Sequence, residues 1–171
     1  FKSIKEVEAL IPKIEAVHHD AFKNNLAYYP STSTEFEMLV KIIMAVADPT
    51  LLKAVMKGDE IAGFIIAYPN ISKALQRIKG QIYPFGWIDL LLEKKRTKII
   101  DIDGVGLLPQ YQGLGNNALL YVEIEKTLLE RGSESVEIIQ VDERNFRSKS
   151  DMENMGVIFN KTHRAYRKTI Q

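Results

Sequence analysis

A glycine-containing loop between an apolar strand and an amphipathic helix is the feature of this sequence best suited to chemistry. The loop spans residues 110–115 and contains Gly113 and Gly115, and Asn116 then opens the helix. The apolar positions of this helix at helical spacing, which predict its buried face, are Ala118, Leu119, Val122, Leu128 and Leu129. Glycine has no Cβ, so its backbone can approach a ligand closely, and a helix start adds N–H donors and partial positive charge. The pattern therefore predicts a phosphate-binding loop. A tight turn that binds nothing is the simpler interpretation of the two glycines alone.

Two acidic residues lie on the strand that leads into this loop. Residues 99–108 are rich in β-branched and apolar side chains, which is typical of a buried central strand, and Pro109 ends it. Asp101 and Asp103 are two residues apart, so a strand directs both to one face. A carboxylate placed there can remove a proton from a nucleophile. Two ordinary solvent-facing or capping charges remain the alternative interpretation.

Residues 107–117 resemble the acyl-CoA signature of the GNAT N-acetyltransferase superfamily. That signature is a strand ending in V-x-P, followed by Gln/Arg-x-x-Gly-x-Gly/Ala at the start of a helix. Gln112 and Gly115 match its first two defined positions, and Gly113 matches the glycine usually found after the Gln/Arg. Asn117 departs from the final Gly/Ala. The resemblance covers roughly residues 51–170.

This resemblance implies an α+β, GNAT-like acyl-CoA N-acyltransferase fold, with a mixed, mostly antiparallel central sheet flanked by helices. It implies acetyl-CoA or another acyl-CoA as cofactor and no metal. The fourth and fifth strands of such a fold splay apart, and the thioester carbonyl rests on a backbone N–H, here that of Leu107. Asp101 and Asp103 are then the candidate bases. The implied cofactor-binding residues are Leu107, Leu108, Gln112, Gly113, Leu114, Gly115, Asn116, Asn117 and Asn145.

The C-terminal part departs from the family pattern at one catalytic position. Residues 145–156 resemble the family's N-x-x-A-x-x-x-Y-x-x-x-G-F stretch, which places Asn145 beside the pantetheine arm. Met152 stands where the family has the tyrosine that protonates the departing thiolate. Methionine cannot donate a proton. Tyr166 is the candidate substitute.

The elements of this C-terminal part follow from apolar periodicity. A strand is predicted over residues 135–141 and a helix over residues 146–155, ending at Gly156. Two closing strands are expected over residues 157–160 and 163–169.

The N-terminal half supplies further elements. Residues 3–23 show helical periodicity, with Pro12 marking a kink or a boundary, and a second helix is expected to begin at a capping box, Thr34 to Glu37. His18 and His19 are adjacent in the first of these helices. They therefore point about 100° apart and are interpreted as surface residues rather than metal ligands. Tyr28 and Tyr29, between these helices, are candidate pocket-lining residues near the acceptor.

A hairpin and an insertion connect these helices to the candidate site. Residues 51–68 predict two strands joined by a turn at Lys57–Glu60. Residues 69–98 form the expected insertion, which contains an aromatic segment, Tyr83 to Trp87. That segment is interpreted either as a lid over the acceptor cleft or as a packed apolar cap, and residues 93–96 as a solvated turn.

Length and composition limit the overall interpretation. The 171 residues suffice for one domain, predicted over 1–171 with N-terminal helices (1–48), hairpin (51–68), insertion (69–98) and acyl-CoA-binding core (99–171). The sequence has no cysteine, which excludes disulfides and a thiol nucleophile, and its net charge is +1. No apolar run is long enough to span a bilayer. The chain begins at Phe1, which is consistent with the C-terminal part of a longer protein.

The sequence therefore predicts a cytoplasmic acyl-CoA-dependent N-acyltransferase that acts on the amine of a small molecule or peptide. Neither nucleic acid nor membrane is an expected partner, and a homodimer is left open. Two other classes remain: a catalytically silent acyl-CoA-binding domain, and a structural or other ligand-binding module of a longer protein. A Rossmann domain is disfavoured because the sequence contains no G-x-G-x-x-G.

Overall fold

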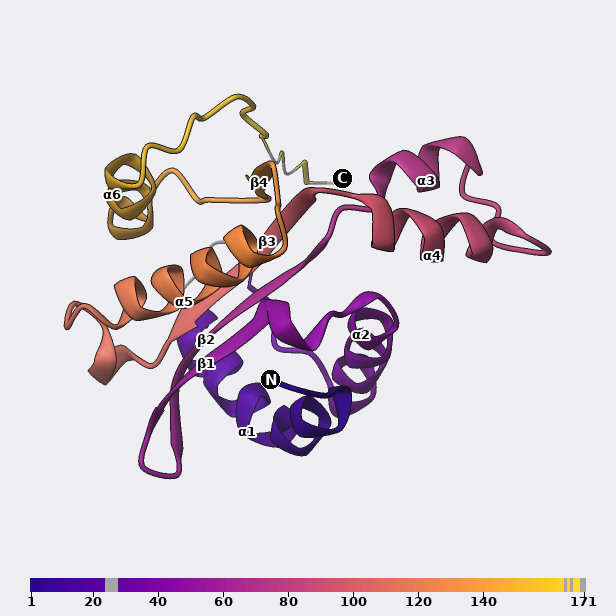
Figure 1. Ribbon diagram of the computed structural model, residues 1–171. Helices are drawn as coiled ribbons and strands as arrows, with labels where there is room; N and C mark the ends of the chain where they lie inside the picture. The colour runs from indigo at the N-terminus through magenta and orange to yellow at the C-terminus, as the bar shows by residue number, and fades with distance from the viewer. Residues whose placement is uncertain (24–27, 165, 167, 170–171) are drawn as a thin grey trace. The chain divides into compact units, whose positions relative to one another are not determined.

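The computed structural model describes residues 1–23, 28–164, 166 and 168–169 (Figure 1). Residues 1–140 form one compact unit and residues 141–171 form a second, and each is described by itself. The first unit contains, in order, α1 (Ile4–Phe22), α2 (Ser33–Val46), β1 (Leu52–Lys57), β2 (Glu60–Pro69), α3 (Ser72–Arg77), α4 (Gly86–Arg96), β3 (Ile99–Leu107), α5 (Asn116–Glu130) and β4 (Ser135–Ile138). The second contains α6 (Phe146–Asn154).

The four strands form one sheet in the order β1-β2-β3-β4. β1, β2 and β3 pair antiparallel, whereas β4 pairs parallel to β3 after the crossover through α5. The predicted mixed, mostly antiparallel sheet and the predicted hairpin are therefore confirmed. Gly63 on β2 is required by a close approach, because an added Cβ would lie 2.6 Å from Leu107 Cδ2 and 2.8 Å from the Gly106 carbonyl oxygen.

Helices cover both faces of this sheet (Figure 1). α1 packs Val17 against Phe64 of β2. α5 packs Leu120 and Ile124 against the opposite face, where the buried partners are Leu51, Ile65, Ala67, Ile100 and Ile102. Burial of this apolar surface is the main force that holds the three layers together.

The buried face of α5 differs from the one that periodicity indicated. Of the predicted positions, Leu128 is buried, but Leu119, Val122 and Leu129 are 55%, 46% and 72% exposed. The helix instead buries Leu120, Ile124, Thr127 and Leu128. This sequence carries apolar side chains around most of the helix, so tertiary packing against the sheet decides which stripe is inside.

Three other local predictions are corrected. α1 is one continuous helix that passes through Pro12, so Pro12 does not mark a boundary between two helices. The capping box of α2 is formed by Thr32 and Glu35 rather than by Thr34 and Glu37: Glu35 N–H donates to Thr32 Oγ1, and Thr32 N–H donates to Glu35 Oε2. Residues 93–96 form the last turn of α4, with Glu93 buried, because an ion pair with Arg77 compensates its charge.

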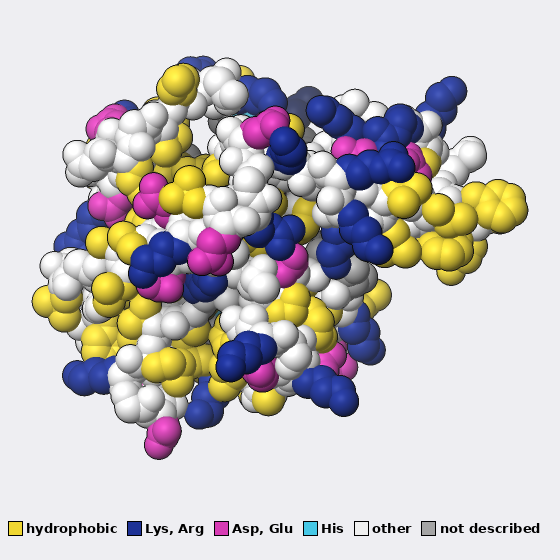
Figure 2. All heavy atoms as spheres, viewed as in Figure 1, with side chains coloured by type: hydrophobic (Ala, Val, Ile, Leu, Met, Phe, Trp, Pro, Cys, Tyr) yellow, Lys and Arg dark blue, Asp and Glu magenta, His cyan; other side chains and the backbone are white. Residues whose placement is uncertain are grey.

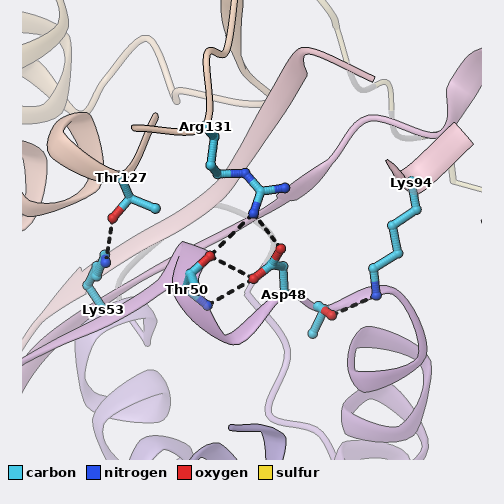
Figure 3. Close-up of polar contacts among 7 residues, drawn as sticks. Asp48, Thr50, Lys53, Lys94, Thr127 and Arg131 are labelled. Carbon is cyan, nitrogen blue, oxygen red and sulfur yellow. Dashed lines mark hydrogen bonds and ion pairs between the residues drawn. The ribbon is translucent and has the colours of Figure 1, made fainter. Parts of the chain in front are cut away.

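Polar contacts attach the ends of α4 and α5 to the segment that precedes β1 (Figure 3). Arg131 donates to Asp48 at 2.6 Å, and Lys94 donates to the Ala47 carbonyl oxygen at 2.8 Å. Burial opposes ionisation of Asp48, but hydrogen bonds from Thr50 and Arg131 outweigh it and lower the pKa of this carboxyl.

The second unit contains the predicted helix but not the predicted closing strands. Asn145 caps α6 by accepting a hydrogen bond from the Ser148 N–H at 3.1 Å, and Gly156 follows the helix with φ +75°. Within the described residues after Gly156 there is no strand, so the prediction for residues 157–160 and 163–169 is wrong there. A strand needs a hydrogen-bonded neighbour, and apolar β-propensity alone does not supply one.

Candidate active site

The glycine loop adopts the conformation that its sequence predicts. Gly113 and Gly115 have φ +76° and +79°, a region that favours glycine, and Gly115 is the N-cap of α5. A Cβ built on either glycine would meet nothing within 4 Å, so the space beside both is open. The N–H groups of the first turn of α5 lie next to this space. Such groups favour the binding of an anion.

Side-chain hydrogen bonds hold the loop in place. Gln112 Nε2 donates to the Leu107 carbonyl oxygen at 3.0 Å, and Asn116 Nδ2 donates to the Tyr111 carbonyl oxygen at 2.9 Å. The Tyr111 hydroxyl donates to Glu60 at 2.7 Å, which connects the loop to the β1–β2 turn. The side chain of Gln112 thus has a structural role in joining the loop to the end of β3.

β3 leaves β4 before it reaches the loop. The two strands pair from Ile99 to Ile102 on β3, and Ile139 N–H donates to the Ile102 carbonyl oxygen at 3.1 Å, after which β3 continues to Leu107. The Leu108 N–H donates to Ala62 on the β2 side. Backbone groups alternate in direction along an extended strand, so the Leu107 N–H faces the opposite edge, where β4 has diverged.

A bulge places Asp103 at the point where the strands diverge. Ile66 of β2 pairs with Gly104 and Ala67 pairs with Ile102, so Asp103 is the additional residue. Two residues earlier, Asp101 lies opposite Tyr68 of β2 and opposite Glu137 of β4. The sheet therefore collects acidic groups from two strands around one tyrosine.

The charges of these groups influence one another. Burial, the charges of Asp103 and Asp101, and a hydrogen bond with Asp103 raise the pKa of Tyr68 to about 12, so the phenol keeps its proton at neutral pH. Burial also raises the pKa of Asp101, with contributions from Glu137 and Asp103. Asn70 opposes this by donating a 2.9 Å hydrogen bond to Asp101 Oδ1. We call Tyr68, Asn70, Asp101, Asp103 and Glu137 the polar cluster.

His18 of α1 lies beside the polar cluster. Its ring stacks on Phe64 with centroids 6.3 Å apart and contacts Phe22 at 4.9 Å. Burial lowers the pKa of His18, partly opposed by the carboxylate of Asp103. The imidazole is therefore half-buried and largely neutral at neutral pH, rather than the simple surface residue that the sequence predicted.

A cavity of about 300 Å³ lies next to this histidine, between α1, the loop before α2 and α2 itself. Its lining includes His18, His19, Tyr28 and Phe36. His19 Nδ1 and the Tyr28 hydroxyl are 3.1 Å apart. The structure thus brings Tyr28 to the cavity, as predicted for a pocket residue, whereas Tyr29 is 82% exposed.

The predicted site residues fall into two groups. Asp101, Asp103 and residues 107–117 lie together in the first unit, along β3 and the start of α5. Asn145 and Tyr166 belong to the second unit, so the roles predicted for them stay predictions. Within the described residues, no group of His, Asp and Glu side chains is arranged to hold a metal ion.

Sequence reasoning missed four members of this site: His18, Tyr68, Asn70 and Glu137. Alternation along β2 could have placed Tyr68 on the same face as Phe64. The other three depend on strand register and helix packing, for which the sequence carries no local signal.

Replacing Asp101 with asparagine is expected to raise stability at neutral pH. The pKa of Asp101 is higher in the folded than in the unfolded protein. Ionised Asp101 therefore lowers the free energy of unfolding at any pH above the folded-state pKa. This loss of stability disappears as the pH falls to the pKa of Asp in the unfolded chain, about 3.9. Asparagine keeps the oxygen that accepts from Asn70. Urea unfolding at neutral pH and near pH 4 should show an advantage of the variant only at neutral pH. A less stable variant at neutral pH would contradict this assignment.

Solved structures of acetyltransferases share this fold. A possible acetyltransferase from Clostridium difficile 630 superposes with a TM-score of 0.63 at 12% identity, over 95% of this chain and 93% of that one. An aminoglycoside N-acetyltransferase in complex with CoA superposes with a TM-score of 0.60 at 11% identity, over 95% and 91% of the two chains. This protein therefore has the fold of the GNAT N-acetyltransferases.

Two curated proteins are similar in sequence. A bacterial ceramide synthase from Caulobacter vibrioides is 28% identical over 166 residues, and Protein YghO from Escherichia coli K12 is 24% identical over 163 residues. These matches cover 94% and 92% of this chain but only 43% and 42% of those proteins. The chain thus spans less than half of the length of these relatives. No protein-family model matches the sequence.

Proposed function

We propose that this domain is an acyl-CoA-dependent N-acyltransferase, with acetyl-CoA as the first donor to test. The observation that supports it is one arrangement: β3 continues to Leu107 beyond Ile102, the last residue that pairs with β4, and then leads directly into the glycine loop at the start of α5. The thioester of an acyl-CoA can lie along this part of β3 while the pyrophosphate of the same molecule accepts hydrogen bonds from the N–H groups of the loop. CoA-bound structures with this fold support the same cofactor.

The chemistry is the attack of an amine nitrogen on the thioester carbonyl carbon. The C–N bond forms, the C–S bond breaks, and the nitrogen gives up a proton. In this proposal the Leu107 N–H stabilises the developing oxyanion, and Asp103 accepts the proton directly or through one water. Asp101 is the second candidate base. The roles of Asn145 at the pantetheine arm and of Tyr166, in place of Met152, as the acid that protonates the departing thiolate rest on the sequence resemblance alone.

The acceptor is a small molecule or a peptide with a free amine. One relative is named a bacterial ceramide synthase, and a ceramide is an N-acylated long-chain amine. A long-chain amino alcohol is therefore the first acceptor to test, together with a long-chain acyl-CoA as an alternative donor. Aminoglycosides are a useful second set, because a structural neighbour is an aminoglycoside N-acetyltransferase.

A catalytically silent acyl-CoA-binding domain is the second candidate function. The observation that favours it is Met152, which is buried and cannot act as an acid. Binding without turnover across the acceptor set would support this alternative.

Calorimetric titration of the protein with acetyl-CoA and with free CoA is the first test. We expect binding in the micromolar range, equivalent to about 8 kcal/mol. Free CoA should compete with acetyl-CoA, because the phosphates and the pantetheine provide most of the contacts. Absence of heat and of a thermal shift at millimolar ligand would exclude the acyl-CoA site, and with it both candidate functions.

A further inference from the structure

The insertion before β3 is a helical hairpin with one paired face. α3 and α4 are joined by residues 78–85. The guanidinium of Arg77 on α3 donates to both carboxylate oxygens of Asp89, at 2.9 and 2.8 Å, and also to Glu93. Because Asp89 and Glu93 are one helical turn apart, both acidic side chains of α4 are directed toward α3.

A second face of this hairpin is apolar and open to solvent. Trp87, Ile88, Leu91 and Leu92 form a stripe at helical spacing on α4, and each is at least 40% exposed. The connection adds Tyr83 and Phe85, which are 87% and 72% exposed. Figure 2 shows apolar side chains gathered over this part of the molecule, beside Lys and Arg side chains. The aromatic segment is therefore not the packed cap that one interpretation of the sequence predicted.

The hairpin is also strongly basic in an almost neutral chain. Residues 70–98 contain two acidic residues, Asp89 and Glu93, and both are paired with Arg77. The same residues contain seven basic side chains: Lys73, Arg77, Lys79, Lys94, Lys95, Arg96 and Lys98. Lys98 follows α4 and pairs with Glu134, and Lys94 donates to the Ala47 carbonyl oxygen. Without Lys98, the hairpin itself (residues 72–96) carries four net positive charges, although the whole chain carries +1.

We propose that the α3–α4 hairpin is a peripheral docking surface for the headgroup region of an anionic lipid bilayer. Tyr and Trp favour the membrane interface, long basic side chains reach its phosphates, and aliphatic residues enter the acyl region. No helix in the described part of the chain is long and apolar enough to span a membrane, and interfacial binding requires none. This inference goes beyond the proposed function and does not depend on it.

A membrane explains the hairpin better than a nucleic acid does. Aromatic side chains can stack on bases, but Ile88, Leu91 and Leu92 offer no such contact and would remain exposed on a nucleic acid complex. The basic charge complements an anionic surface, whereas an apolar stripe alone would not select one. The two features together fit a surface that is anionic outside and apolar beneath.

Vesicle co-sedimentation of the whole chain tests the proposal. We expect the protein to bind vesicles in which about a third of the lipid is phosphatidylglycerol, to bind pure phosphatidylcholine vesicles at least about tenfold more weakly, and to lose affinity as salt increases. Equal binding to both vesicle types, or no binding to either, would overturn the proposal.

Paired variants locate the surface. Phe85→Ser with Trp87→Ser should weaken vesicle binding at least about tenfold. Met38→Ser with Ile42→Ser should not, although these α2 residues are also exposed, by 62% and 66%. Lys79→Glu with Lys95→Glu should weaken binding similarly, whereas Lys5→Glu with Lys41→Glu makes the same charge change outside the hairpin. Circular dichroism confirms that each variant is folded.

Three results would assign the hairpin to something else. Unchanged vesicle binding by folded hairpin variants would overturn the proposal. So would a dimer of the wild-type chain, detected by sedimentation, that dissociates only in the Phe85 and Trp87 variant, because the surface would then be a self-association interface. Binding to single-stranded RNA that the same variants abolish, in the absence of vesicle binding, would also overturn it.

Discussion

Replacing Gly115 with aspartate is expected to abolish measurable binding of CoA and acetyl-CoA. The substitution adds a negative charge and a side chain to the space where the proposal puts a pyrophosphate, at the N-terminus of α5. The aspartate carboxylate and the pyrophosphate would be close neighbours of like charge, and such charges repel strongly where water is partly excluded. We expect affinity to fall at least about 100-fold, or roughly 2.8 kcal/mol, in a calorimetric titration. Gly113→Asp should have a similar effect.

Backbone strain must be separated from loss of the anion site. Gly58 in the β1–β2 turn also has a left-handed φ, +59°, and a Cβ there would meet nothing within 4 Å. Gly58→Asp therefore adds the same charge and similar strain outside the loop, and its CoA affinity should remain that of the wild type. If Gly113→Asp and Gly115→Asp both bind CoA normally, the glycine loop does not bind the pyrophosphate.

The glycine loop, the β1–β2 hairpin and β3 were predictable because their signals are local. A turn between two apolar runs predicts the hairpin, and Pro109 predicts the end of a strand. Gly113 and Gly115 predict the loop, in which both have a positive φ. Each of these depends on neighbours within a few residues. The resemblance to GNAT proteins then predicted a mixed, mostly antiparallel sheet, which no local signal contains.

The rest of the site depended on pairings between distant residues. Glu137 lies beside Asp101 only because β4 pairs parallel to β3 in one register. His18 reaches Asp103 because α1 packs across Phe64. The bulge at Asp103 appears only in the register with β2 and has no sequence signature of its own. Tertiary packing likewise decided which stripe of α5 is buried.

Replacing Asp103 with asparagine is expected to lower the turnover number about 100-fold or more, with little effect on CoA affinity. Asp103 is the exposed carboxylate at the divergence of β3 and β4, so it can reach an incoming amine, and asparagine cannot accept the proton. The anion loop is unchanged in this variant. The measurements are steady-state kinetics with the acceptor found by screening, and calorimetry with acetyl-CoA.

Comparison with two neighbouring variants separates a base from a merely polar neighbour. Tyr68→Phe removes the hydroxyl that bonds to Asp103 but leaves its carboxylate, so turnover should fall by only about tenfold if the tyrosine positions that carboxylate. His18→Gln tests the other nearby proton acceptor. If Asp103→Asn keeps full turnover and His18→Gln loses it, the histidine is the base, and the carboxylate of Asp103 is not needed for the proton transfer. Burial lowers the pKa of His18. With His18 as the base, turnover should therefore rise with pH, and the midpoint of that rise should lie below the pKa of a free histidine.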